Sequence, residues 1–383
     1  MLAPEPFLQP RGTPISIYFR IKTLSDLGHK VDLITYHLGE DVKIRNLEIL
    51  RIPDIFFIKK VKIGPSLAKV PLDFLLFVKA FFQLTIKQYD LLISHEEAAW
   101  PGTILAIIWR MPHIYDMHSS LPDQLETFNF SHSKLLKKAF LGIEKYILKN
   151  SQALIIICPD LLKKAEKAGC GKKAILLENF LEFKNQELSE QRIQKKRREF
   201  TPKGEKIVLY TGNFEPYQGI PLLLKAAAKI RDERVLFLLV GGSKANREKM
   251  GRKAKALGIS NKVIFTGEVI PSEVPLFISI ADVLVSPRLR GRNTPLKIYS
   301  FLKSGKPLVA TNLWTHIQVL NPENSVLVDP NPQSLAEGIC FALWNTEAQK
   351  RSRAAKELAE REYTYPRYLE KVSKALEKAC NTH

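Results

Sequence analysis

The second half of the chain contains a stretch whose residue types suit the binding of an anion. Residues 286–311 read as the end of an apolar strand, a basic loop, a helix and a second apolar strand. Thr294 is a good N-cap and Pro295 suits the first helical position, while Gly305 and Pro307 would end the helix. A helix N-terminus presents free N–H groups that bind phosphate. Cationic side chains flank this helix start, namely Arg288, Arg290, Arg292 and Lys297. The stretch predicts either a phosphate site or a capped surface helix with solvated arginines.

Polar side chains also follow two apolar strands predicted in the first half of the chain. After the strands at 89–94 and 113–117 come His95, Glu96, Glu97, His118 and Ser119. In an open parallel sheet, ligands bind at the carboxyl ends of the strands. A histidine in such a position has either a catalytic or a purely structural role, and the sequence leaves both open.

These residues need a sheet to position them, and the pattern of the chain predicts two. Short apolar runs alternate with helical stretches in both halves, which is typical of Rossmann-like α/β domains. A length of 383 residues favours two domains. We predict an N-terminal domain at 1–183, a charged linker at 184–205 and a C-terminal domain at 206–360. Several strands of the second half run into glycine, where a backbone can approach a ligand closely, as at Gly212 and Gly241.

The composition narrows the class of partner. A formal net charge of +19 favours anionic partners such as nucleotides or an acidic membrane surface. No motif that reads nucleic acid accompanies this charge, so we expect no nucleic-acid binding. The four cysteines form no C-x-x-C pair and no zinc spacing, so we expect no metal. We see no signal peptide, and the apolar stretch at 70–86 is short for a span of ~20 residues. We therefore expect a cytoplasmic protein.

Two stretches have the composition of a membrane surface contact. Residues 51–88 mix aromatic and aliphatic residues with lysines, and we weigh membrane contact and ordinary packing evenly there. Residues 134–149 have apolar residues at helical spacing with a basic opposite face. For this second stretch we favour a helix packed on the sheet over an interfacial helix.

The second half resembles the C-terminal domain of family 4 glycosyltransferases. Five segments carry this resemblance in order and spacing: GNFEPYQGIPLLLKA, LLVGG, VIFTGEV, ADVLVSP and TPLKIYSFLKSGKPLVAT. The first half is compatible through the glycine turn at Gly12, the segment DMHSS and the segment LLENF, where Asn179 matches an interdomain motif. The resemblance implies the GT-B fold, in which two Rossmann-like domains flank a cleft. It also implies that the last helix, at 361–383, returns to the N-terminal domain.

The resemblance further implies a retaining transferase that moves a sugar from a nucleotide donor to an acceptor. The co-substrate would be UDP- or GDP-linked, with no metal and no other cofactor. The donor would lie mainly on the C-terminal domain and a lipid-linked or polysaccharide acceptor on the N-terminal one. His118 matches the histidine that contacts the transferred sugar, and Gly12 matches the loop near the donor phosphates.

This sequence departs from the family pattern at four positions. Arg292 and Ser300 stand where the family has two glutamates, and Asn213 and Gln218 stand where it tends to have an arginine and a lysine. A departing nucleotide diphosphate gains negative charge, which fixed cations must meet. An active enzyme would therefore need other cations, and Lys297 is among the candidates.

The predicted site has three parts. The catalytic candidates are His118, Lys297 and Arg292. The donor-binding candidates are Gly12, Thr13, Gly212, Asn213, Gln218, Gly241, Arg288, Asn293, Thr294, Pro295 and Ser300. The acceptor-side candidates are His95, Glu96, Glu97 and Ser119. The alternative interpretation is a catalytically weak relative that acts as a nucleotide-sugar-binding or scaffold subunit. For the protein as a whole we expect a cytoplasmic location, with peripheral association at the inner face of a membrane as an option.

Overall fold

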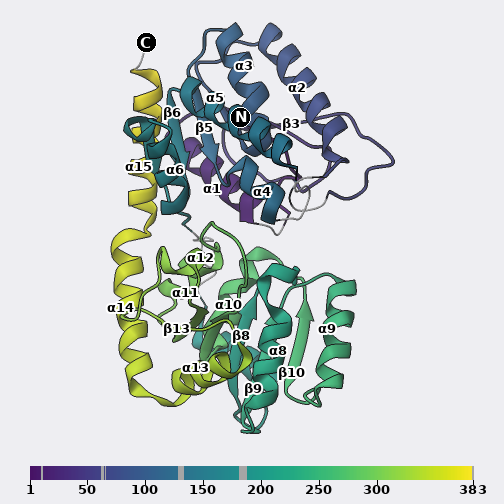
Figure 1. The fold of residues 1–383 in the computed structure, drawn as a ribbon, viewed down its shortest axis with the longest axis vertical. Helices are drawn as coiled ribbons and strands as arrows, with labels where there is room; N and C mark the ends of the chain where they lie inside the picture. The colour runs from purple at the N-terminus through teal and green to yellow at the C-terminus, as the bar shows by residue number, and fades with distance from the viewer. Residues whose placement is uncertain (10–11, 62–63, 65, 128–132, 181–187, 382–383) are drawn as a thin grey trace. The chain divides into compact units, whose positions relative to one another are not determined.

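The computed structural model describes residues 1–9, 12–61, 64, 66–127, 133–180 and 188–381. The chain divides into two compact units (Figure 1), which are Met1–Asn179 with Tyr365–His383, and Phe180–Thr364. Each unit is built on a sheet in which every strand pair is parallel. The predicted α/β class with two Rossmann-like domains is therefore confirmed.

The first unit contains seven strands in the order β3-β2-β1-β4-β5-β6-β7. They are β1 (Leu2–Ala3), β2 (Val31–Thr35), β3 (Leu47–Arg51), β4 (Leu92–His95), β5 (His113–Met117), β6 (Ala153–Ile156) and β7 (Ala174–Leu176). The sequence analysis did not predict β3. This strand lies at the sheet edge, where Glu48 and Arg51 stay partly solvent-exposed, so it has no continuous apolar run.

Helices cover both faces of this first sheet. They are α1 (Gly12–Asp26), α2 (Lys69–Ile86), α3 (Ala99–Ile108), α4 (Leu121–Thr127), α5 (Lys134–Asn150), α6 (Pro159–Lys167) and α15 (Tyr365–Cys380), with short 3-10 turns η1 (Glu96–Ala98) and η2 (Gly171–Lys173). The C-terminal helix α15 packs against β5, β6, β7 and α1 of this unit (Figure 1). α5 buries Glu144, Ile147 and Leu148, which confirms the packed-helix interpretation of 134–149.

The second unit contains six strands in the order β10-β9-β8-β11-β12-β13. They are β8 (Lys206–Thr211), β9 (Val235–Val240), β10 (Val263–Gly267), β11 (Val283–Ser286), β12 (Leu308–Thr311) and β13 (Val326–Val328). Alternate residues of β8 enter two different cores, since Val208 and Tyr210 pack on one face and Ile207 and Leu209 on the other. A strand buried on both faces must be apolar throughout, which is why these strands were visible in the sequence.

The helices of the second unit also lie on both faces of its sheet. They are α7 (Glu190–Phe200), α8 (Ile220–Lys229), α9 (Lys244–Ala256), α10 (Val274–Ile280), α11 (Lys297–Lys303), α12 (Trp314–Ile317), α13 (Pro332–Trp344) and α14 (Thr346–Glu362), with the 3-10 turns η3 (Pro216–Gln218) and η4 (Pro271–Glu273). In the parts of the chain that the structure describes, we find no helix with the length and apolarity needed to cross a bilayer.

Two predicted segments differ in detail from the structure. α11 begins at Lys297 rather than beside Thr294, and the Thr294 side chain does not cap it: the N-cap residue is Leu296 and no side chain caps the helix. The predicted N-cap was therefore wrong, because the backbone at Leu296 is already helical and Thr294 is buried. Within the predicted linker 184–205, residues 184–187 lie outside the described residues. Residues 190–200 form α7, whose Arg197 pairs with Asp282.

Candidate functional site

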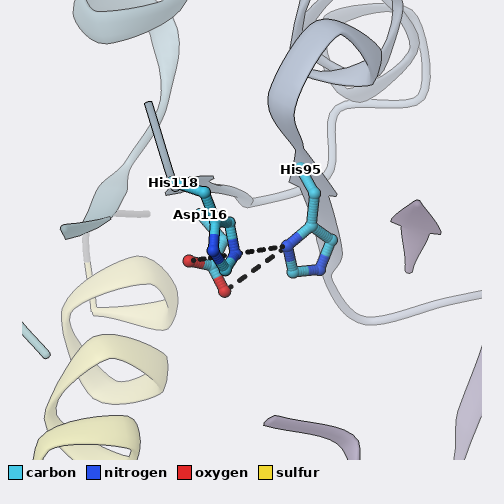
Figure 2. A group of neighbouring side chains, drawn as sticks. All are labelled: His95, Asp116 and His118. Atoms are coloured by element: carbon cyan, nitrogen blue, oxygen red, sulfur yellow. Dashed lines mark hydrogen bonds and ion pairs between the residues drawn. The ribbon is translucent and has the colours of Figure 1, made fainter. Parts of the chain in front are cut away.

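Three side chains at the carboxyl ends of β4 and β5 form a buried cluster, which Figure 2 shows. His95 ends β4, Asp116 lies in β5 and His118 follows it. His118 Nε2 lies 3.2 Å from Asp116 Oδ1, and His95 Nδ1 lies 3.3 Å from His118 Nε2 and 3.5 Å from Asp116 Oδ2. The two predicted histidines are therefore neighbours, and β4 pairs with β5 in the register that aligns His95 with Asp116.

Asp116 owes its charge to a buried arginine of α1. Arg20 donates from Nε to Asp116 Oδ2 at 2.7 Å and from Nη2 to Oδ1 at 3.2 Å. Its Nη1 donates to the hydroxyl of Tyr368 on α15 at 3.0 Å. Burial by itself raises the pKa of Asp116, but Arg20 and the two histidines together hold that pKa well below its usual range. The carboxylate therefore stays ionised inside the unit.

The two histidines differ in protonation because they differ in their relation to Asp116. Burial lowers the pKa of His95 to about 3, with only partial compensation by Asp116. Burial also acts to lower the pKa of His118, but the charge of Asp116 and a hydrogen bond to it raise the net value above the ordinary one. Asp116 thus favours the protonated form of His118, whereas burial favours the neutral form of His95, whose Nε2 is buried without a hydrogen-bond partner among the described residues.

His95, Asp116 and His118 are close enough to one another to hold a metal ion. Imidazole and carboxylate ligands suit zinc. However, the Arg20 guanidinium contacts both oxygens of Asp116, so a divalent ion here would stand beside a buried cation. The residues therefore fit an ion pair with a protonated histidine better than a metal.

Acidic side chains surround this cluster. Glu96 begins η1 with a φ of 46°, a backbone conformation that non-glycine residues seldom adopt. Its Oε2 accepts hydrogen bonds from Ser119 Oγ at 2.7 Å and from Gln124 Nε2 at 2.8 Å. Glu97 pairs with Lys69 at 2.5 Å. The four acceptor-side candidates, His95, Glu96, Glu97 and Ser119, therefore lie together at the carboxyl ends of β4 and β5.

A second group of predicted residues meets at the carboxyl ends of β8 and β11. The Lys297 ammonium lies 3.8 Å from the centroid of the Tyr210 ring. A Cβ added to Gly212 would lie 2.9 Å from Lys297 Nζ, and φ at Gly212 is +133°. Glycine is thus required at 212 both for its backbone conformation and for the space beside Lys297.

Three of the predicted site residues at this end of the second unit each have a buried polar atom with no hydrogen-bond partner among the described residues. These atoms are Gln218 Oε1, Thr294 Oγ1 and Lys297 Nζ. Burial lowers the pKa of Lys297 well below its ordinary value, and the charge of Arg288 lowers it further. Buried polar groups are nearly always satisfied, so three unsatisfied ones among predicted site residues indicate a place for a polar ligand.

Arg288 has a different role from the one expected of a cation that faces a ligand. Its guanidinium donates to the carbonyl of Arg290 at 2.7 Å and to the carbonyl and Oδ1 of Asn293 at 3.2 Å each. The next residue, Leu289, donates from its backbone N–H to the Tyr217 carbonyl at 2.8 Å. Arg288 therefore shapes the basic loop, and the loop is tied to the one that carries Gln218.

The remaining candidates occupy the starts of helices and loops. Gly12 is exposed at the first turn of α1, where Ser16 Oγ donates to the Gly12 carbonyl at 3.1 Å and to Asn179 Oδ1 at 2.6 Å. Asn213 Oδ1 accepts from the N–H of Glu215 at 3.3 Å. The others are placed as follows: Thr13 is half-buried in α1, Gly241 directly follows β9 with φ +113°, Arg292 is exposed, Pro295 is buried and Ser300 is half-buried on α11.

Sequence reasoning missed several residues that build these two groups. Arg20, Asp116 and Tyr368 come from three distant segments, and Tyr210 and His316 support the second group. His316 Nε2 lies 2.9 Å from Ser286 Oγ, and its Nδ1 lies 2.8 Å from the Thr311 carbonyl. Only an acidic residue inside an apolar strand, as in HIYDM, could have drawn attention to Asp116.

Comparison with known proteins agrees with this arrangement. The family model for Glycosyltransferase Family 4 matches residues 11–181, and that for Glycosyl transferases group 1 matches residues 191–359. A glycosyltransferase of Methanocaldococcus jannaschii described as uncharacterized is 24% identical over 326 residues, which is 82% of this chain and 80% of that protein. The alpha-monoglucosyldiacylglycerol synthase of Streptococcus pneumoniae is 25% identical over 318 residues, which is 79% of this chain and 68% of that protein.

Solved structures show the same fold. HepE of Anabaena, crystallised with UDP, superposes with a TM-score of 0.77 at 18% identity and covers 97% of this chain and 98% of its own. The sucrose-phosphate synthase of Thermosynechococcus elongatus superposes with a TM-score of 0.78 at 20% identity, over 97% of this chain and 94% of its own. The expected GT-B fold is thereby confirmed. The chain belongs to the family 4 glycosyltransferases.

Proposed function

We propose that this glycosyltransferase moves a sugar from a UDP- or GDP-linked donor to a glycan or lipid-linked acceptor, with retention at the anomeric carbon and without a metal. The observation that carries the proposal is the trio of unsatisfied buried atoms on Gln218, Thr294 and Lys297. A nucleotide diphosphate offers acceptor oxygens to the ammonium and the hydroxyl. The names of relatives support the donor class, since HepE was crystallised with UDP.

The chemistry assigns a role to each group. The acceptor hydroxyl oxygen would form a bond to the anomeric carbon on the same face from which the phosphate oxygen departs, which gives retention. As the bond from that carbon to the phosphate oxygen breaks, the hydroxyl proton would pass to the departing phosphate oxygen. The nucleotide diphosphate that leaves gains negative charge, and a preorganised ammonium at Lys297 would stabilise it. His118, charged beside Asp116, would donate a hydrogen bond to the transferred sugar. The acceptor would approach Glu96 and Glu97, and the protein would work on the cytoplasmic side, peripheral to a membrane.

A donor panel tests the proposal. The protein would be incubated with UDP- and GDP-linked sugars, nucleotide release would be followed by mass spectrometry, and donor binding would be measured by calorimetry. We expect one donor class to bind and release its nucleotide. Lys297→Ala should weaken donor binding. Lys303→Ala, which removes another cation from α11, is its control. Failure of every donor to bind would contradict the proposal.

A second function, binding without catalysis, follows from the residues at 213, 218 and 300. Asn213, Gln218 and Ser300 are uncharged where the family resemblance implies an arginine, a lysine and a glutamate. A scaffold subunit would bind a donor without turning it over. If a donor binds but none is turned over, and His118→Ala leaves cellular function intact, this second function becomes the better account.

A further inference from the structure

The outward face of α2 is apolar over its whole length. Val70, Phe74, Phe82 and Ile86 are 63%, 63%, 62% and 78% exposed, at i,i+4 and i,i+8 spacing along the helix. An ordinary surface helix would present charged residues here, because only its inward stripe has to be apolar. An exposed apolar face of this kind is typical of a surface that binds a partner or a membrane.

Two of the three charged residues of α2 contact other side chains of the first unit. Lys69 pairs with Glu97 at the acceptor-side edge, and Asp73 accepts a hydrogen bond from the buried Tyr36 hydroxyl. Of the helix's three charged residues, this leaves only Lys79 uncommitted to such a contact. Lys69 and Asp73 are thus engaged within the first unit, whereas Phe74 and Phe82 are exposed.

Neighbouring elements extend the apolar face. α3 lies beside α2 (Figure 1), and the rings of Phe81 and Trp109 meet edge to face at 5.2 Å. The loop before α2 buries Ile58 against the α2 core and leaves Phe56 and Phe57 outside, 80% and 69% exposed. We call the whole set the α2–α3 surface, which comprises Phe56, Phe57, Leu67, Val70, Phe74, Phe81, Phe82, Ile86, Trp100, Ile107 and Ile108. These elements carry 11 of the 20 exposed large hydrophobic side chains in the described part of the chain, so exposed apolar residues are concentrated on them.

Charge decides which occupant fits. Exposed cations lie among these residues at Lys59, Lys60 and Arg110, and Lys79 lies on α2 itself. Residues 54–110 also contain two exposed carboxylates, those of Asp54 and Asp90, and Asp54 Oδ1 lies 3.3 Å from His37 Nε2. Aromatic side chains next to lysines match the interface of a bilayer that contains anionic lipid, where rings enter the headgroup region and ammonium groups meet phosphates.

We propose that the α2–α3 surface docks this protein on an anionic lipid bilayer. This assignment rests on the proposed function. It gives a membrane-binding role to a surface next to the acceptor-side residues, because the first turns of α2 contact Glu97 and Tyr36. A lipid-linked acceptor in that bilayer would have a short path to Glu96. Membrane docking needs no donor, so it can fail or succeed independently of sugar transfer.

Vesicle sedimentation tests the proposal with the full chain. Vesicles of phosphatidylcholine mixed with phosphatidylglycerol should bind the protein, and vesicles of phosphatidylcholine alone should bind it more weakly. Phe74→Ser with Phe82→Ser should weaken binding about tenfold or more, because two aromatic side chains no longer enter the interface. The matched control is Ile270→Ser with Trp344→Ser, which removes two exposed apolar side chains, 62% and 50% exposed, from the second unit and should bind as the parent does.

Further measurements keep the outcome decisive. Lys59→Gln with Lys60→Gln should reduce binding to the mixed vesicles several-fold and flatten its salt dependence. Thermal melting and UDP binding should be unchanged in all these variants, which separates lost docking from lost folding. No binding by the parent protein, or equal losses in the control, would overturn the proposal. So would a dimer in light scattering that Phe74→Ser with Phe82→Ser dissociates, because the covering partner would then be a second copy of the chain.

Discussion

Arg20 and Asp116 form a two-point ion pair with no access to solvent, joining α1 to β5 at 2.7 Å and 3.2 Å. Asp116 of this pair also lies 3.2 Å from His118, and Arg20 donates a hydrogen bond to Tyr368 of α15. Because a buried charge is stable only with its partner, this pair links the integrity of the first unit to the protonation of a catalytic candidate.

Asp116→Asn should lower the free energy of unfolding by about 3–5 kcal/mol, because Arg20 would remain buried without a counter-charge. It should also lower the pKa of His118, since Asp116 is the main group that raises that pKa. Denaturant unfolding and NMR titration of the histidine measure the two effects. Asp41→Asn is the control, because its pair with Arg51 is exposed and should be worth at most about 1 kcal/mol. Equal losses in both variants would contradict this account.

His316→Gln should remove a pH dependence of stability. Burial lowers the pKa of His316 to about 3, whereas in the unfolded chain the value is near 6.5. As the pH falls below 6.5, His316 binds a proton in the unfolded state but stays neutral in the folded state. The free energy of unfolding therefore decreases. The parent should therefore lose up to about 1.4 kcal/mol per pH unit relative to the variant between pH 6.5 and 5. Chemical unfolding of both proteins at several pH values measures the difference, and a constant difference would refute the assignment.

Lys297→Met should affect folding and ligand binding in opposite directions. The buried ammonium contacts the Tyr210 ring but has no hydrogen-bond partner among the described residues, so a methionine of similar length should leave stability unchanged or raise it. Binding of UDP or GDP should weaken at least about tenfold, because a charge-assisted contact of about 1.5–3 kcal/mol is lost. Ser300→Ala, on the same helix, should weaken binding less, and Arg292→Ala should weaken it more than Ser300→Ala. Thermal melting and calorimetry provide the two readouts, and the reverse ranking would mean that the ligand lies elsewhere.

Nucleotide binding should be accompanied by proton uptake. Burial and the neighbouring Arg288 lower the pKa of Lys297 in the free protein. A bound diphosphate supplies negative charge and raises that pKa again, so the complex holds the proton more tightly than the free protein does. Calorimetry in buffers with different ionisation enthalpies counts this proton. Its absence in the parent, or its persistence in Lys297→Met, would show that Lys297 does not meet the phosphates.

Gly212→Ala should abolish donor binding while the protein remains folded. The new Cβ would lie 2.9 Å from Lys297 Nζ and 3.2 Å from the Tyr210 hydroxyl, at a φ that alanine rarely adopts. The lysine side chain can yield, but then its ammonium leaves its place over the Tyr210 ring. Gly251→Ala is the matched control, because a Cβ there meets no atom within 4 Å and alanine favours the helix by about 0.5–1 kcal/mol. Donor binding retained in Gly212→Ala would contradict the predicted position of the phosphates.

The sequence by itself determined the class of fold and most of the strands. Strands buried on both faces, such as β8 and β9, must be apolar throughout, and glycine or small polar residues end them where a ligand site begins. β3 could not be predicted in this way, because an edge strand tolerates charged residues such as Glu48 and Arg51. The candidate site residues His95, His118, Gln218, Thr294 and Lys297 could be selected from the sequence, because each stands just beyond a strand or near a helix start; their roles stay predictions.

The tertiary structure decided how those residues act. Pairing of β4 with β5 sets His95 beside Asp116, and α1 and α15 bring Arg20 and Tyr368 to the same carboxylate, which no spacing in the chain reveals. The N-cap expected at Thr294 proved wrong, because Thr294 is buried with its hydroxyl unpaired and the helix starts beyond it. Burial and neighbouring charge depend on three-dimensional packing, so protonation and unpaired atoms can be assigned only once distant segments have been brought together.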